Sequence, residues 1–163
     1  MRHFFSRVLC VGAVLAAFVV PASAHVRTGM FPSDPMPPLT EPWKPVVVAK
    51  IDKSEQRMRV YVNGKRTYSW RISTARRGYI TPSGAWKPKR IHKMWYSRKY
   101  NMSPMPHSVF YHGGYAIHGT YDLKRLGRPA SHGCVRLHPS NAKKFYQLVA
   151  RYGMGNTQIV VTR

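Results

Sequence analysis

The stretch Ala130-Ser131-His132-Gly133-Cys134-Val135-Arg136-Leu137 places a cysteine beside a histidine, and a second histidine stands sixteen residues before that cysteine, in Ile117-His118-Gly119-Thr120. The only other cysteine, Cys10, lies in an apolar N-terminal run. A cysteine attacks a carbonyl carbon as its thiolate, and a nearby histidine can take the thiol proton near neutral pH. Cys134 is therefore a candidate nucleophile.

Gly133 fits the same interpretation. Glycine adopts positive φ without strain, so a turn at Gly133 is expected to aim the backbone N–H groups of Gly133 and Cys134 at a developing oxyanion. Small residues at this point also let a substrate backbone come close.

Several separated stretches occur in the same order as in one known protein family. They are Val60-Tyr61-Val62-Asn63-Gly64-Lys65, Thr81-Pro82-Ser83-Gly84, Ile117-His118-Gly119-Thr120 and Ser131-His132-Gly133-Cys134-Val135-Arg136-Leu137. From about Val46 to Val161 the chain resembles the L,D-transpeptidase catalytic domain, the YkuD family. The resemblance implies a mainly β fold: a β-sandwich with one packed C-terminal helix and a short helical turn.

The resemblance also implies an activity. Cys134 would attack a peptidoglycan tetrapeptide stem, release the terminal D-alanine and pass the acyl group to an amine, which forms 3→3 cross-links. With water as the acceptor the protein would be an L,D-carboxypeptidase, and with an amine of an envelope protein it would anchor that protein to the wall. A catalytically inactive, basic wall-binding module is a further alternative. No cofactor is implied.

Site roles follow from matching the motif residue by residue. His118 is the expected general base, oriented by the backbone carbonyl of Gly119. His132 and Gly133 are expected to shape the catalytic loop. Arg136 is expected either to bind donor carboxylates or to hold the loop. Ser131 and Thr120 are expected to take part in substrate binding.

The segment from Met94 to His112 is rich in methionine, proline and aromatic residues, and in the family it forms a loop or lid beside the cysteine. Such a cluster is more often core than cavity wall. Within it, Tyr111 is the residue expected nearest to the substrate. The charged positions Lys87, Lys89, Arg90 and Lys93 are interpreted as a solvated basic face, and Asp122 as a turn residue.

A zinc site is the competing interpretation of the same side chains. The potential ligands are His112, His118, His132, Cys134 and His138. Their spacing fits no common Cys/His zinc pattern, so no metal is predicted.

The 163 residues predict one domain, and the formal net charge of +22 predicts an anionic partner. Nucleic acid, an acidic membrane surface and a polyanionic cell wall are all partners of this kind. Nucleic acid is disfavoured, because the basic residues are scattered and no nucleic-acid-binding motif is present.

The N-terminus predicts export. Arg2 and Arg7 precede an apolar run from Val8 to Val20, which ends in Pro21-Ala22-Ser23-Ala24. This layout is typical of a signal peptide over residues 1–24, with the periplasm as the expected compartment. An uncleaved anchor is the alternative, but thirteen apolar residues fall short of the ~20 of a spanning helix, so no membrane span is expected after cleavage. Residues 25–45 contain six prolines and are expected to form an extended arm before a catalytic domain at 46–163.

The domain itself is predicted to form several strands, then a helix and a final strand. Alternation from Gln56 to Val62, an Asn63-Gly64 turn and a return over 65–73 predict a hairpin. Trp86 is expected to begin a strand, and 115–118 to form another. Pro139, helical spacing of apolar residues and Gly153 predict a helix over 139–152, and 157–162 a last strand.

Overall fold

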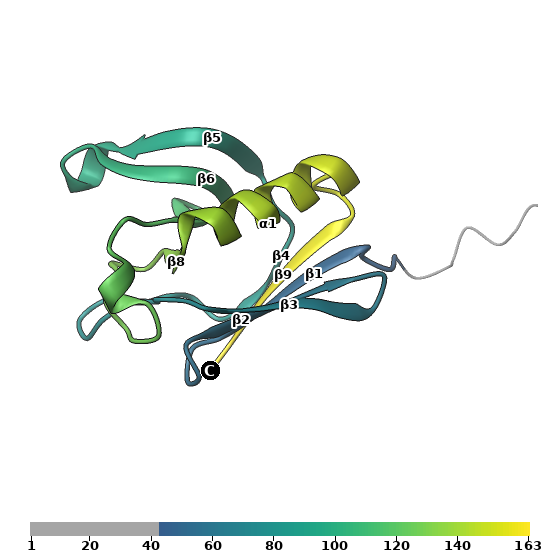
Figure 1. Ribbon diagram of the computed structural model, residues 1–163, viewed down its shortest axis with the longest axis horizontal. Helices are drawn as coiled ribbons and strands as arrows, with labels where there is room; N and C mark the ends of the chain where they lie inside the picture. Colours follow the sequence, from purple (N-terminus) through teal and green to yellow (C-terminus); the bar gives the residue numbers. More distant parts are fainter. Residues whose placement is uncertain (1–42) are drawn as a thin grey trace, which may run out of the picture. The chain divides into compact units, whose positions relative to one another are not determined.

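The computed structural model describes residues 43–163, so the expected signal peptide at 1–24 and most of the arm at 25–45 lie outside the described residues (Figure 1). The described part contains nine strands, one α-helix and two short 3-10 helices. They are β1 (Val47–Asp52), β2 (Arg57–Val62), β3 (Lys65–Arg71), β4 (Gly84–Trp86), β5 (Arg90–Ser97), η1 (Arg98–Tyr100), β6 (Ser103–His112), β7 (Tyr115–Gly119), η2 (Leu123–Arg125), β8 (Val135–Leu137), α1 (Pro139–Tyr152) and β9 (Thr157–Thr162).

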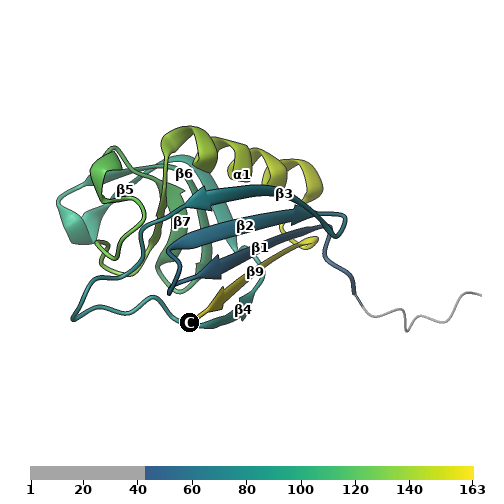
Figure 2. The same cartoon turned by 60° about the horizontal axis from the view of Figure 1, so that its bottom comes forward.

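The first sheet has the strand order β3-β2-β1-β9-β4 (Figure 2). The predicted hairpin is confirmed, because β2 and β3 pair antiparallel across Asn63 and Gly64, whose φ angles are 49° and 77°. Two positive φ values in a two-residue connection match the twist of the flanking strands. Trp86 ends β4 instead of beginning a strand, since only Gly84 to Trp86 pair with β9.

The second sheet has the strand order β5-β6-β7-β8. The segment expected as a loop or lid is mostly regular structure here. β5 and β6 form a long antiparallel hairpin whose tip carries η1, and this hairpin extends beyond α1 in Figure 1. The paired main chain holds the aromatic side chains of this segment in fixed positions on the two faces of the sheet.

The helix α1 supplies the packing between the two sheets. Pro139 stands in its first turn and Gly153, with φ of 88°, ends it, as the sequence predicts. Ala142, Phe145 and Val149 are buried and join the core with residues from both sheets. The helix contacts β5, β6 and β7 of the second sheet and β1 of the first. The predicted mainly β fold with one packed helix is thus confirmed.

A short segment after β3 connects the first sheet to the loop before β8. The backbone of Ser73 exchanges two hydrogen bonds with Arg136, at 3.0 and 2.8 Å. The carbonyl oxygen of Thr74 accepts from the N–H groups of Ala130 and Ser131, both at 2.9 Å. Gln56 supports this segment from behind, because its side chain bonds both the hydroxyl and the N–H of Thr74. These bonds fix the main chain that carries the cysteine.

Within residues 43–163 no helix is long and apolar enough to cross a membrane. Trp43, at the start of this part, lies under the ammonium group of Lys87 at 3.8 Å from the ring centroid.

Candidate active site

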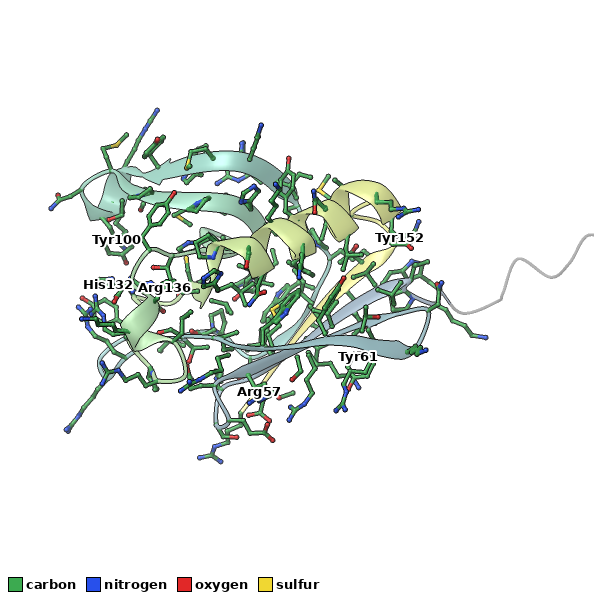
Figure 3. All side chains as sticks on the ribbon, viewed as in Figure 1. Arg57, Tyr61, Tyr100, His132, Arg136 and Tyr152 are labelled. Atoms are coloured by element: carbon green, nitrogen blue, oxygen red, sulfur yellow. The ribbon has the colours of Figure 1, made fainter. Side chains whose placement is uncertain are left out.

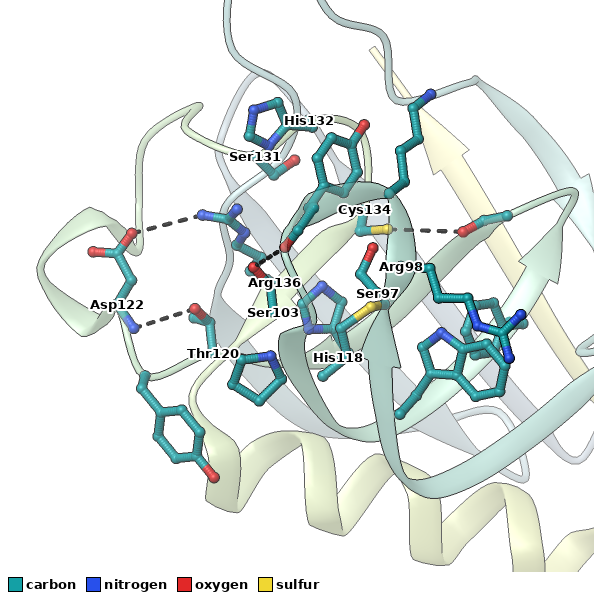
Figure 4. A pocket seen from close by; sticks show the side chains of 18 of the residues that line it. Ser97, Arg98, Ser103, His118, Thr120, Asp122, Ser131, His132, Cys134 and Arg136 are labelled. Carbon is teal, nitrogen blue, oxygen red and sulfur yellow. Dashed lines mark hydrogen bonds and ion pairs between the residues drawn. The ribbon is translucent and has the colours of Figure 1, made fainter.

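An open cavity of about 610 Å³ lies between the β5–β6 hairpin and the segments that flank β7 and β8 (Figure 4). Six of the nine residues expected at the site line it: His118, Thr120, Ser131, His132, Cys134 and Arg136. The remaining three, Tyr111, Gly119 and Gly133, do not line it. Figure 3 shows His132, Arg136 and Tyr100 at the same end of the molecule.

Cys134 stands immediately before β8. Its neighbour Val135 points into the core, so the thiol points to the opposite face of the sheet, toward the cavity. The half-buried side chain packs against Met105, Phe110 and Ala116. Burial raises the pKa of the Cys134 thiol, while the backbone N–H of Ala116 acts in the opposite direction. At neutral pH the resting side chain is therefore a thiol.

His118 reaches the cavity from the neighbouring strand β7, which runs parallel to β8. Its ring is 6% exposed, and Nδ1 lies 2.7 Å from the carbonyl oxygen of Gly119. A carbonyl only accepts, so Nδ1 carries the proton and Nε2 keeps its lone pair. Burial lowers the pKa of His118 to about 4, although the bond to Gly119 partly opposes that shift. The expected carbonyl contact is present, and the ring is a neutral base.

Gly133 adopts a conformation that other residues avoid, with φ of 133°. A Cβ atom at this position would lie 2.8 Å from the carbonyl oxygen of Ile80 and 2.5 Å from the ring of Tyr115. The N–H of Gly133 donates to Ser131 Oγ at 3.0 Å. This differs from the expectation that the Gly133 N–H points at an oxyanion, because the nearer hydroxyl already accepts it.

His132 is held by three side chains from outside its own loop. Nη2 of Arg76 donates to Nε2 of His132 at 2.7 Å. The ring of Tyr100 stacks on it at 4.5 Å, and Tyr79 meets it edge-on at 4.6 Å. Burial and the charge of Arg76 lower the pKa of His132. Because Arg76 occupies Nε2, His132 forms part of the cavity wall in this arrangement and leaves His118 as the available base.

Arg136 is paired with an acid that sequence reasoning treated as a turn residue. Asp122 Oδ2 lies 3.6 Å from Arg136 Nη1 and also forms an ion pair with Arg125 (Figure 4). The N–H of Asp122 donates to Thr120 Oγ1 at 3.2 Å, which places Thr120 in the same network. The carboxylate thus fixes Arg136 at one side of the cavity.

Tyr111 lies elsewhere than expected. It is fully buried in the core, on the face of β6 opposite to Phe110. Burial raises the pKa of its phenol, and its hydroxyl has no hydrogen-bond partner within the described residues. The strand alternation that brings Phe110 to the cavity turns Tyr111 away from it.

A family model for the L,D-transpeptidase catalytic domain, YkuD, matches residues 47–161. The chain belongs to the YkuD family of L,D-transpeptidase catalytic domains. No curated protein matches the chain.

Solved L,D-transpeptidase structures share this fold. The structure from Stackebrandtia nassauensis is 27% identical with a TM-score of 0.64, and the match covers 80% of this chain and 62% of that one. The Mycobacterium smegmatis structure is 20% identical with a TM-score of 0.65, covering 73% and 59%. L,D-transpeptidase 3 from Mycobacterium tuberculosis, solved with a faropenem-derived adduct, is 19% identical with a TM-score of 0.62, covering 73% and 61%. The chain spans about three fifths of each of these proteins.

In this YkuD-family chain, four residues that were not predicted as site residues support the site. Arg76 and Tyr100 hold His132, Asp122 holds Arg136, and Thr81 bonds the carbonyl of Gly133. Only Thr81 lay in a stretch that matched the family. The others belong to segments that meet the cysteine loop only after folding.

The histidines considered as zinc ligands do not converge. Residues 43–163 contain no group of three or more His, Cys, Asp or Glu side chains placed to hold a metal ion.

Proposed function

We propose that this protein is an exported cysteine L,D-transpeptidase that acts on peptidoglycan stems, with Cys134 as nucleophile and His118 as general base. One observation carries the proposal. His118 lies in β7, Cys134 immediately precedes the parallel neighbouring strand β8, and both line one cavity; the histidine proton sits on Nδ1, so Nε2 is left to accept a proton. A nucleophile beside an oriented neutral base is the arrangement that acyl transfer requires.

In the acylation step, His118 Nε2 takes the thiol proton while Cys134 Sγ attacks the carbonyl carbon of the third stem residue. The tetrahedral intermediate then collapses, and the bond to the terminal D-alanine breaks. The departing amine takes the proton from His118, which returns to its neutral form. The products are a thioester on Cys134 and free D-alanine.

In the second step, an acceptor amine attacks the thioester carbonyl and gives a proton to His118. Cys134 leaves as a thiolate and takes that proton back, so the enzyme is regenerated. An amine of another stem yields a 3→3 cross-link, an amine of an envelope protein yields an anchored protein, and water yields a tripeptide. The same two residues serve all three outcomes, so only the acceptor distinguishes them.

The electrostatics favour a neutral resting pair. The pKa of Cys134 is raised by burial and that of His118 is lowered to about 4 by burial, so neither side chain is charged near neutral pH. Proton transfer therefore accompanies the attack on the carbonyl, in place of a thiolate formed beforehand.

The compartment and partner belong to the same proposal. The N-terminal pattern supports export, with the periplasm as the preferred compartment, and the net charge of +22 suits a polyanionic wall. Peptidoglycan stems supply both the donor peptide and the acceptor amine.

The proposal is tested by mass spectrometry of the purified protein incubated with disaccharide-tetrapeptide, beside a Cys134→Ala variant. A 3→3 dimer that requires Cys134 supports transpeptidation, and tripeptide without dimer supports a carboxypeptidase or another acceptor. Incubation with a carbapenem should add the mass of the drug to the protein only when Cys134 is present. Absence of product and of any acyl-enzyme would instead favour a wall-binding module.

A further inference from the structure

Arg90, at the start of β5, is exposed to solvent as the sequence predicts, and it also lies on the cavity side of the strand. It lines the same cavity as Cys134. The neighbouring Lys87 and Lys89 do not line that cavity. Antiparallel pairing sets Arg90 opposite Phe110 of β6, so both side chains project from one face of the sheet.

Aromatic rings hold the guanidinium group of Arg90 in place. Its Cζ atom lies 4.2 Å from the ring centroid of Phe110 and 5.0 Å from that of Trp95. His92 packs against both rings, at 4.8 Å from Trp95 and 5.9 Å from Phe110. Stacking of this kind fixes the plane of a guanidinium and leaves its N–H edge free to donate.

Arg90 forms no ion pair with a carboxylate of residues 43–163, in contrast to the arginines across the cavity. Among residues 43–163, Asp122 is the only acidic residue that lines the cavity, and it pairs with both Arg125 and Arg136. Four arginines line the cavity: Arg90, Arg98, Arg125 and Arg136. Arg90 is the one whose guanidinium is stacked on aromatic rings and has no carboxylate partner among residues 43–163.

The same aromatic residues connect Arg90 to the thiol. Phe110 and Trp95 belong to one apolar cluster with Met105, Ala116 and Cys134. A ligand that lies along this cluster with its carbonyl carbon at Cys134 would place its other end near the guanidinium of Arg90. Because an unpaired guanidinium fork matches a carboxylate in geometry and charge, an anionic group on the ligand is the natural occupant.

We propose that Arg90 binds a free carboxylate of the donor stem and thereby selects stems in which this group is not amidated. The carboxylate is the one at the end of the side chain of the third residue, which in the family is usually meso-diaminopimelate. This inference rests on the proposed function and names the substrate form of the same site. It assigns the primary contact with that carboxylate to Arg90, whereas the sequence left carboxylate binding as one of two possible roles of Arg136. Arg136 is already engaged by Asp122, so a second carboxylate gains less there.

The test is equilibrium binding to the full chain carrying Cys134→Ala, which removes turnover from the measurement. Two tetrapeptides are compared by calorimetry, one with the free carboxylate and one with its amide. The free acid is expected to bind about tenfold more tightly, as a charge-assisted hydrogen bond implies. In the background of Arg90→Gln the two peptides should bind alike, and Arg90→Lys should restore part of the preference, since it keeps the charge but not the fork.

Two matched controls keep the charge change constant. Arg98→Gln removes a cation that lines the cavity without stacking on Phe110 or Trp95, and Lys89→Gln removes one outside the cavity. Both should retain the tenfold preference. Equal binding of the two peptides to the chain with Arg90 intact, or loss of the preference in Arg98→Gln alone, would overturn the inference.

Turnover of both peptides by the protein with Cys134 present separates this inference from the proposed function. Equal turnover of acid and amide would leave the transpeptidase proposal standing and reject the role of Arg90. Selective binding of the acid without any Cys134-dependent product would support the Arg90 site and reject the transpeptidase proposal.

Discussion

The hydroxyl of Thr81 donates a hydrogen bond of 2.7 Å to the carbonyl oxygen of Gly133, fifty-two residues further along the chain. The hydroxyl oxygen of Thr81 in turn accepts a hydrogen bond from the N–H of Ala75 at 3.0 Å. Thr81 is 2% exposed, so water does not compete for either bond. One side chain thus ties the loop before β4 to the residue that precedes the cysteine.

Replacing Thr81 by valine should therefore destabilise the protein and loosen the cysteine loop. The change keeps the shape but leaves two backbone groups without partners, at about 1–3 kcal/mol for each buried group. We expect a loss of at least about 2 kcal/mol in denaturant unfolding and a roughly tenfold lower kcat/KM. Thr81→Ser should retain most of both, and Thr67→Val, at an exposed hydroxyl, should change stability by less than about 0.5 kcal/mol.

Gly133→Ala should be more damaging than an ordinary glycine substitution. The added methyl group would lie 2.8 Å from the Ile80 carbonyl oxygen, and φ of 133° is unfavourable for any residue with a Cβ. A loss of about 3 kcal/mol or more, with activity below detection, is expected in thermal unfolding and turnover assays. Gly155→Ala is the matched control, because a Cβ there meets nothing within 4 Å. Similar Tm values for the two variants would contradict the strain at Gly133.

The pH dependence of kcat/KM should report the buried His118. Only the neutral ring can accept the thiol proton, and burial lowers its pKa to about 4. Activity should stay nearly constant from neutral pH down to about 5 and fall by half near pH 4. An acidic limb near the ordinary value of 6.5 would show that His118 is solvated or is not the base.

The same shift makes stability depend on pH. The folded-state pKa of His118, about 4, lies below the value of 6.5 expected after unfolding, so the unfolded chain binds the proton more tightly. The contribution of His118 to the free energy of unfolding is fully present above pH 6.5. It declines as the pH falls toward 4, by up to about 3 kcal/mol. When the free energy of unfolding from urea titrations is plotted against pH, the protein and His118→Asn should have different slopes over this window. Parallel curves would contradict the assignment.

Asp122→Asn tests whether the carboxylate positions Arg136. The pair is partly exposed to solvent, so its removal should lower Tm by no more than a few degrees. KM for the donor should rise about threefold to tenfold while kcat changes less, because Arg136 loses its orientation rather than its charge. Glu55→Gln is the control, since it breaks an exposed pair with Arg59 away from the cavity. An unchanged KM would show that the ion pair of Asp122 with Arg136 has no part in donor binding.

The strands, the helix and the motif were accessible from the sequence because each depends on near neighbours. Alternation and the Asn63-Gly64 turn define the β2–β3 hairpin, and Pro139 and Gly153 bound α1. The contact of His118 with the carbonyl of Gly119 was implied by the resemblance to the family, and the structure shows it.

Tertiary structure decided the rest, because the remaining contacts join residues that are far apart in sequence and carry no pattern in common. Arg76 meets His132 across fifty-six positions, and Tyr100 reaches the same ring from the hairpin tip. Tyr111 was misplaced, and the cavity position of the exposed Arg90 was not foreseen, for one physical reason. Side chains alternate between the two faces of a strand, and which face borders the cavity is set by how the sheets pack. The sequence alone singled out Cys134 and His118 as the candidate nucleophile and base, whereas packing determined which charges surround them.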